Sequence, residues 1–238
     1  IQLIKGAKKE VLIPVIASVN CVSSSGWIGF TKRIEEAGAD ALELNVSLNP
    51  MDLELRYFVQ TIKEIIQKVL DQVSIPVAVK INNSFTHMAR TILDLSNSGI
   101  AGLVLFNRPY TPDIDIETMN AIQGRSFSSP ESYLEPMRWV ALLSDKVNCS
   151  IAASSGIHTP EAVIKQLLAG ADAVQVVSAL YENGVEFIEV LLKGMEQWMN
   201  EKGMSSIDQF KGKASSKKVE NPAVFERIQF MKHFGGIN

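Results

Sequence analysis

The sequence predicts an α/β fold built on a parallel sheet, most simply a (β/α)8 barrel, and three similar segments carry this prediction. In each segment the end of a helix is followed by a glycine, a short link and an apolar run suited to a buried strand. The segments are EEAGADALELN (35–45), LSNSGIAGLVLFN (95–107) and LLAGADAVQVV (167–177). Gly38, Gly99 and Gly170 stand where a helix C-terminus favours a positive φ. Because the apolar runs are continuous rather than alternating, we expect strands buried on both faces, as in α/β barrels and doubly wound sheets.

Six strand–helix units can be followed along the chain. The apolar runs predict strands over 11–20, 41–46, 75–81, 102–107, 149–154 and 173–177. The segments between and after them predict helices over 27–37, 53–73, 86–96, 131–143, 160–169 and 185–201. The start of the fifth helix is the best marked, because Thr159, Pro160 and Glu161 fit an N-cap, a first helical position and an acidic first turn.

Two segments do not fit this alternation. Residues 108–130 contain three prolines and two aspartates and are expected to form an irregular excursion. The polar tail 202–238 is expected to include a last helical piece near 223–233. A closed barrel needs eight units, typically in about 250 residues, and an open barrel of six would expose two edges of a parallel sheet. We therefore expect one barrel domain over 1–238, formed by strands three to eight and the tail, with the first two units missing from this chain.

An open doubly wound sheet is the competing architecture. It would be expected to carry GxGxxG after its first strand, and this pattern does not occur in the sequence.

Composition, charge and the spacing of cysteines and histidines argue against several classes of function. The 238 residues are 46% hydrophobic and 21% charged, with a net charge of −3, so an ordinary globular domain without a nucleic-acid or membrane partner is expected. No apolar run approaches the roughly 20 residues that span a bilayer. Cys21 and Cys149 form no CxxC pair, and the three histidines have no HExxH spacing. We expect a cytoplasmic protein with no metal site and no disulfide framework.

The carboxyl ends of the strands, where barrel enzymes place their sites, carry polar residues. Asn20, Asn45, Lys80 and Asn107 end four successive strands. A single Asn at such a place is ordinarily a turn residue that bonds nearby backbone, but three of them with a lysine favour a ligand site. An Asn amide suits the edge of a heterocycle, and a lysine supplies positive charge to an electron-rich ring. The lack of a carboxylate at these ends argues against a glycosidase pair or a divalent metal site.

The last two strand ends predict a phosphate site. SSGIHTPE (154–161) places small residues and a glycine before a helix, and VVSAL (176–180) has the same character one strand later. Backbone amides and a helix start can hold a phosphate there, which is its standard position after barrel strands seven and eight. In this interpretation Gly156 leaves room for the phosphate. The alternative is a glycine turn followed by an ordinary cap.

These residues resemble a known family. The segments IASVNC, EEAGADALELNVS, PVAVKI, LVLFN, GIHTPEAVIKQLLAGADAVQVVSAL and FERIQFM are similar to the flavin-dependent dihydroorotate dehydrogenases. The motifs IAS-x-x-C and AGADALELN-x-S are also similar to the pyrimidine-reducing domain of dihydropyrimidine dehydrogenase. The resemblance runs from about 14 to 201. It implies a barrel that binds flavin mononucleotide (FMN), a homodimer, and the oxidation of dihydroorotate, a planar heterocycle, to orotate in pyrimidine biosynthesis.

The resemblance also implies roles for individual residues. Asn45 matches an asparagine that touches flavin and pyrimidine, and Lys80 a lysine beside the flavin N1–C2=O edge, where it would stabilise charge on the reduced ring. Asn20 and Asn107 match substrate-binding asparagines. The family's phosphate-binding positions correspond to Ser154, Ser155, Gly156, Val177 and Ser178, with two serines where the family has glycines.

One position departs from the family. The catalytic base, a Cys or Ser, follows the N-x-S sequence, and here that position is Leu48, which cannot take a proton. The following Pro-Asn is reversed, as Asn49–Pro50. Ser47 and Cys21 are the substitutes to consider. Two alternatives therefore stay open, an FMN-dependent reductase of another pyrimidine or heterocycle and a barrel without catalysis.

Overall fold

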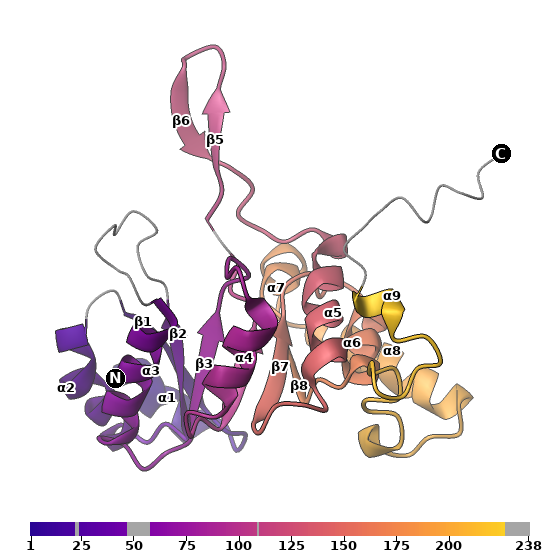
Figure 1. Cartoon of the computed structure of the whole chain (residues 1–238), viewed down its shortest axis with the longest axis horizontal. Helices are drawn as coiled ribbons and strands as arrows, with labels where there is room; N and C mark the ends of the chain where they lie inside the picture. Colours follow the sequence, from indigo (N-terminus) through magenta and orange to yellow (C-terminus); the bar gives the residue numbers. More distant parts are fainter. Residues whose placement is uncertain (22–23, 47–57, 109, 227–238) are drawn as a thin grey trace.

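The computed structural model describes residues 1–21, 24–46, 58–108 and 110–226, with no side chains for 21 and 24–28. Six parallel strands form a curled sheet, part of a barrel, with helices along its outer face (Figure 1). The strand order is β1-β2-β3-β4-β7-β8. The bounds are β1 (Ile16–Cys21), β2 (Ala41–Val46), β3 (Val77–Ile81), β4 (Gly102–Leu105), β7 (Ser150–Ser154) and β8 (Ala173–Gln175). This arrangement confirms the predicted fold class, a (β/α) barrel of which this chain supplies six units.

The described helices lie before, between and after the strands. They are α1 (Gln2–Glu10), α2 (Ser24–Glu36), α3 (Phe58–Leu70), α4 (Met88–Ser96), α5 (Leu134–Leu143), α6 (Pro160–Ala169), α7 (Ser178–Asn183), α8 (Phe187–Glu201) and α9 (Ala223–Glu226). Short 3-10 turns occupy Pro130–Tyr133 (η1) and Ile207–Gln209 (η2). None of the helices in the described ranges is long and apolar enough to cross a membrane.

The two faces of each strand differ, because successive side chains point to opposite sides. On β2, Leu42 and Leu44 are fully buried in the core cluster that the outer helices share. Glu43 and Asn45 alternate with them and lie on the inner side of the barrel, in register with Ala78 and Lys80 of β3. On β2 the helices thus fix the outer face by apolar packing, while the inner face carries Glu43 and Asn45.

The local signals in the sequence are confirmed. Gly38, Gly99 and Gly170 have φ values of 93°, 84° and 117°, so each provides the left-handed residue after a helix. Thr159 caps α6, since its hydroxyl accepts a hydrogen bond from the Ala162 amide at 3.3 Å.

Three local predictions need correction. Residues 2–10 are helical, and the first strand begins at Ile16 rather than at residue 11. The sixth predicted strand ends at Gln175, two residues early, because helix α7 begins at Ser178. The excursion contains an antiparallel hairpin, β5 (Pro112–Asp115) and β6 (Asn120–Gln123), that stands out from the barrel (Figure 1).

The sequence gives only weak signals for this hairpin, because its turn lacks a glycine and its strands are short. The Asp115 carboxylate accepts hydrogen bonds from the amides of Glu117 at 2.9 Å and Thr118 at 3.2 Å, and these bonds close the turn. Met119 then takes a positive φ of 54° without being a glycine. Aspartate can form such a turn alone, but two four-residue strands give little periodic signal.

The polar tail packs on the helices. Phe210 is fully buried, with its ring 5.0 Å from that of Trp198 on α8. The Ser216 amide donates to the carbonyl of Ala141 on α5 at 2.8 Å. A few buried residues therefore fasten a segment whose composition alone indicates a loose tail.

Candidate active site

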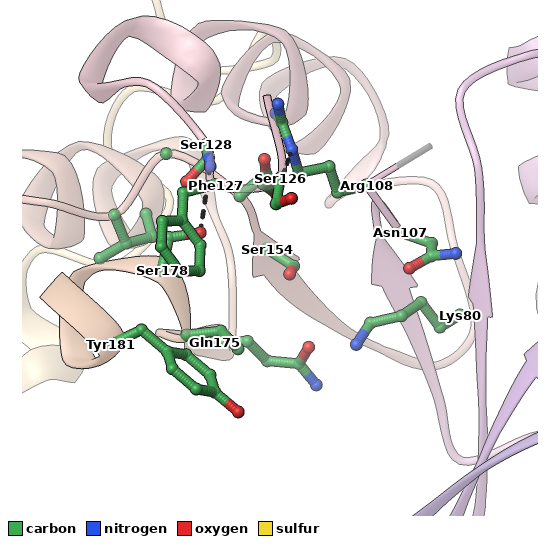
Figure 2. A pocket seen from close by; sticks show the side chains of 14 residues that line it. Lys80, Asn107, Arg108, Ser126, Phe127, Ser128, Ser154, Gln175, Ser178 and Tyr181 are labelled. Atoms are coloured by element: carbon green, nitrogen blue, oxygen red, sulfur yellow. Dashed lines mark hydrogen bonds between the residues drawn. The ribbon is translucent and has the colours of Figure 1, made fainter. Parts of the chain in front are cut away.

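Seven of the predicted site residues line one cavity of about 270 Å³ at the carboxyl ends of the strands (Figure 2). They come from β3, from the segment after β4, from the loop after β7 and from the start of α7. These residues are Lys80, Asn107, Ser154, Ser155, Gly156, Val177 and Ser178. The lining is completed by Arg108, Ser126, Phe127, Ser128, Ile157, Gln175 and Tyr181. Strand ends far apart in the sequence thus converge on one space.

The loop after β7 has an uncommon backbone. Ser155 and Gly156 both have positive φ values, of 87° and 72°. Both residues line the cavity, so the backbone of this loop borders the space directly. A Cβ at Gly156 would lie 2.1 Å from the Tyr133 amide nitrogen, in η1. The glycine is therefore required by close packing against η1, and the predicted reason, room for a phosphate, is not the one that the geometry gives.

A hydrogen-bonded chain supports the β8 side of this loop. The Ser128 amide donates to the Ser178 hydroxyl at 3.0 Å, and the Ser128 hydroxyl lies 3.0 Å from His158 Nε2. The other ring nitrogen of His158, Nδ1, lies 3.4 Å from the carboxylate of Glu182. These contacts connect the segment before η1 and the loop after β7 to helix α7.

An aromatic pair and an arginine form the outer wall. The rings of Phe127 and Tyr181 are stacked, with centroids 5.8 Å apart and planes 24° apart. Arg108 donates to the carbonyls of Ser126 at 3.0 Å and Arg125 at 2.9 Å, so it fixes the path of this segment. The wall is held by the excursion between β4 and α5.

The opposite side of the cavity is charged. Lys80 and Gln175 point toward one another across the space (Figure 2), and the Glu43 carboxylate contacts both. Lys80 Nζ lies 3.1 Å from Glu43, while Gln175 and the Ser18 hydroxyl donate to that carboxylate at 2.7 and 2.6 Å. Burial raises the pKa of Glu43, but these hydrogen bonds and the Lys80 charge outweigh it and hold the pKa below its ordinary value of 4.5.

Two predicted asparagines lie on adjacent strands outside the cavity lining. Asn20 is in register with Asn45, which is in register with Lys80, so the three form a row across β1, β2 and β3. Asn20 is exposed. The Asn45 side-chain oxygen is buried and has no hydrogen-bond partner within the described part of the chain. A buried acceptor of this kind calls for a donor from a ligand or another group.

The position at which the family has its catalytic base, Leu48, is not among the described residues. Ser47 and Leu48 lie outside the described residues, as do Asn49 and Pro50, and the side chain of Cys21 is also outside them.

Sequence reasoning missed Ser18, Glu43 and Gln175. Ser18 and Glu43 stand two residues before Asn20 and Asn45, so they share the inner face of the same strands. A charged residue inside the apolar run ALELNV was the available signal. Reading each strand inward from its polar end in steps of two would have found Glu43.

Comparison with known proteins agrees with the barrel fold and with the family that the sequence resembles. The sequence model of the family described as dihydroorotate dehydrogenase matches residues 1–199. This chain belongs to the dihydroorotate dehydrogenase family. The match covers most of the chain, including all six barrel strands.

Three similar curated proteins are 25–29% identical to this chain over the aligned residues. The catalytic subunit of dihydroorotate dehydrogenase B (NAD(+)) from Methanothermobacter thermautotrophicus is 29% identical over 217 residues, covering 85% of this chain and 69% of the relative. The corresponding subunit from Thermoplasma acidophilum is 25% identical over 209 residues, covering 84% and 68%. Dihydroorotate dehydrogenase A (fumarate) of Lactobacillus delbrueckii subsp. bulgaricus is 26% identical over 190 residues, covering 76% and 62%. The chain thus spans about two thirds of these proteins.

A solved structure shows the same fold. The dihydroorotate dehydrogenase of Eimeria tenella, solved with ferulenol, superposes with a TM-score of 0.69 at 18% identity, covering 89% of this chain and 65% of that one. The comparisons confirm the predicted family and a flavin-dependent oxidoreductase of the dihydroorotate dehydrogenase type, and they do not favour the alternatives.

Proposed function

We propose that this protein binds FMN and oxidises dihydroorotate to orotate, as a step of pyrimidine biosynthesis. The observation that supports this most is the shared cavity, in which a concave small-residue loop faces a lysine and an asparagine. Such a space suits a ligand with a phosphate at one end and a planar ring at the other.

The residues present fit FMN in chemical terms. The turn at Ser155–Gly156, together with Val177 and Ser178, offers backbone amides and hydroxyls to a phosphate. Lys80 stands on the other side of the cavity, next to Asn45, whose unpartnered oxygen could accept a hydrogen bond from a ring N–H. When bound, FMN would supply the hydride acceptor.

The substrate would lie against the polar row at the strand ends. Asn20, Asn45 and Asn107 supply amides that match the donors and acceptors of a pyrimidine ring. Lys80 would hold positive charge beside the ring that gains electrons. A base must remove the proton that dihydroorotate loses together with the hydride. Leu48, at the family's base position, has no group for this, and Ser47 is the neighbouring residue that has a hydroxyl.

An anaerobic spectrum tests this proposal. The purified protein should be yellow or become so with added FMN, and dihydroorotate should bleach it. Bleaching only by another donor would show a different substrate, and failure to bind FMN at all would contradict the proposal.

The relatives are named for two different electron acceptors, NAD(+) and fumarate. A cytoplasmic location, without membrane or nucleic-acid partners, remains a prediction based on composition and charge.

A homodimer is part of the proposal, and the hairpin β5–β6 supports it. Ile114, Ile116 and Met119 are 67%, 81% and 84% exposed on this projection. Two strands alone are marginal in water, so a second copy that covers these side chains would stabilise the hairpin. Ile116→Ser combined with Met119→Ser should shift the sedimentation coefficient toward that of a monomer. Unaltered sedimentation as a dimer would move the interface elsewhere.

A further inference from the structure

We propose that Glu43 is a positioning residue that holds Lys80 in place and neutralises its charge, so that the bound ring meets an ion pair rather than an isolated cation. The inference rests on the proposed FMN site and extends it to a residue that does not line the cavity.

The first support is the burial and convergence of contacts at Glu43. The residue is 4% exposed, and its carboxylate meets groups from three other strands, Ser18 of β1, Lys80 of β3 and Gln175 of β8. The bond from Gln175 is notable because β2 and β8 are separated by three strands in the sheet order. Glu43 therefore joins the two sides of the barrel interior at one point.

The second support is the geometry of Lys80. Its side chain is 16% exposed, and its Nζ lies 3.1 Å from the carboxylate. A lysine side chain has four rotatable bonds, and an anchor at its end removes much of this freedom before any ligand arrives. The ion pair thus determines where the cation stands at the edge of the cavity.

The third support is the location of the partners of Glu43. Lys80 and Gln175 both line the cavity. If the pair served only to fill the barrel, apolar residues of similar volume would do so with equal or better stability. An ion pair whose cation borders the cavity has a further effect, since the anion offsets the positive charge that acts on whatever ring lies there.

Glu43→Gln tests the proposal. The amide keeps the size of the side chain and removes its negative charge, which leaves Lys80 as an uncompensated cation. A reduced, anionic flavin should gain from this change. We expect the affinity for reduced FMN relative to oxidised FMN to rise by about tenfold, which is about 30 mV upward for a two-electron couple. The readouts are the FMN dissociation constant and the midpoint potential.

Two further variants separate charge from structure. Lys80→Met should shift the potential downward, in the opposite direction, and Glu64→Gln, the same chemical change on the exposed face of α3, should not shift it. A purely structural role for Glu43 predicts a lower melting temperature in Glu43→Gln with no upward shift. If that variant does not fold, Glu43→Asp replaces it, because a carboxylate one methylene shorter withdraws from Lys80 and should give a smaller rise.

The outcomes are distinct. A wild-type protein that takes up no FMN would overturn the proposed function, and this inference with it. A protein that takes up FMN but whose potential does not rise in Glu43→Gln, or in the aspartate variant where that one is used, would overturn this inference alone.

Discussion

The two sides of the cavity are built by different means. On the β7–β8 side, the shape comes from backbone turns and small residues, such as Ser155 and Gly156 with their positive φ values. On the β2–β3 side, the site depends on the charges of Glu43 and Lys80. A backbone cradle can keep its function with serine in place of glycine, provided that the turn survives. A charged pair cannot change either member without changing the field in the cavity.

The division implies two kinds of mutational effect. Changes on the cradle side should act on whether a ligand is held and on stability. Changes on the charged side should act on the chemistry of a ligand that is still held.

Gly156→Val should have the largest effect. Its Cβ would overlap the backbone at Ser132 and Tyr133, and valine at a φ of 72° is strained. Overpacking and strain together cost about 2–5 kcal/mol, so unfolding experiments should show a large loss of stability and FMN titration a loss of binding. Gly203→Val is the matched control, because this glycine has a φ of 66° and no atom lies within 4 Å of the added Cβ. Equal stability in the two variants would show that close packing at Gly156 is unimportant.

Leu48→Cys should change the rate of reduction next. A positioned general base typically contributes about 10²–10⁴-fold, so the wild-type protein should oxidise dihydroorotate slowly and the cysteine variant should recover part of this factor. Stopped-flow bleaching under anaerobic conditions measures both rates, with Leu48→Ala as the control. Fast bleaching by the wild type would show that the base lies elsewhere, with Ser47 and Cys21 the first residues to change.

The stability that Glu43 contributes should depend on pH. Because its pKa is lowered in the folded protein, its contribution is present above the ordinary value of 4.5 and is lost as the pH falls through the lowered folded value. The wild type should exceed Glu43→Gln in unfolding free energy by about 1–3 kcal/mol at neutral pH, and by less in acid. Denaturant titrations from pH 7 downward measure this difference. A gap that stays constant into acid, or widens, would show that the carboxylate is not held in its charged form.

The sequence predicts much of this arrangement. The helix–glycine–strand segments were sufficient to predict the parallel sheet, because the end of a helix and the burial of a strand each depend on nearby residues. The segments 154–156 and 177–178 follow two neighbouring parallel strands, and their residues line one cavity, whereas their role in holding a phosphate stays a prediction.

The remaining features depend on distant contacts. Gly156 is required by η1, a segment more than 20 residues away in the chain, so its reason could not be derived from the loop alone. Gln175 joins Glu43 across 132 positions, and no local pattern pairs them. The hairpin β5–β6 is closed by the carboxylate of Asp115, one of two aspartates in the excursion, and the sequence alone does not distinguish it from Asp113.

If the loop after β7 and the start of α7 hold FMN while Lys80 sets its reduction potential, Lys80→Met should separate the two functions. The midpoint potential and FMN dissociation constant of Lys80→Met should be compared with those of the wild type. We expect most of the affinity to remain, because the phosphate contacts are untouched, and the potential to fall, because positive charge beside the reduced ring is lost. An unshifted potential, or the complete loss of FMN from a folded variant, would contradict the division of the site into two functions.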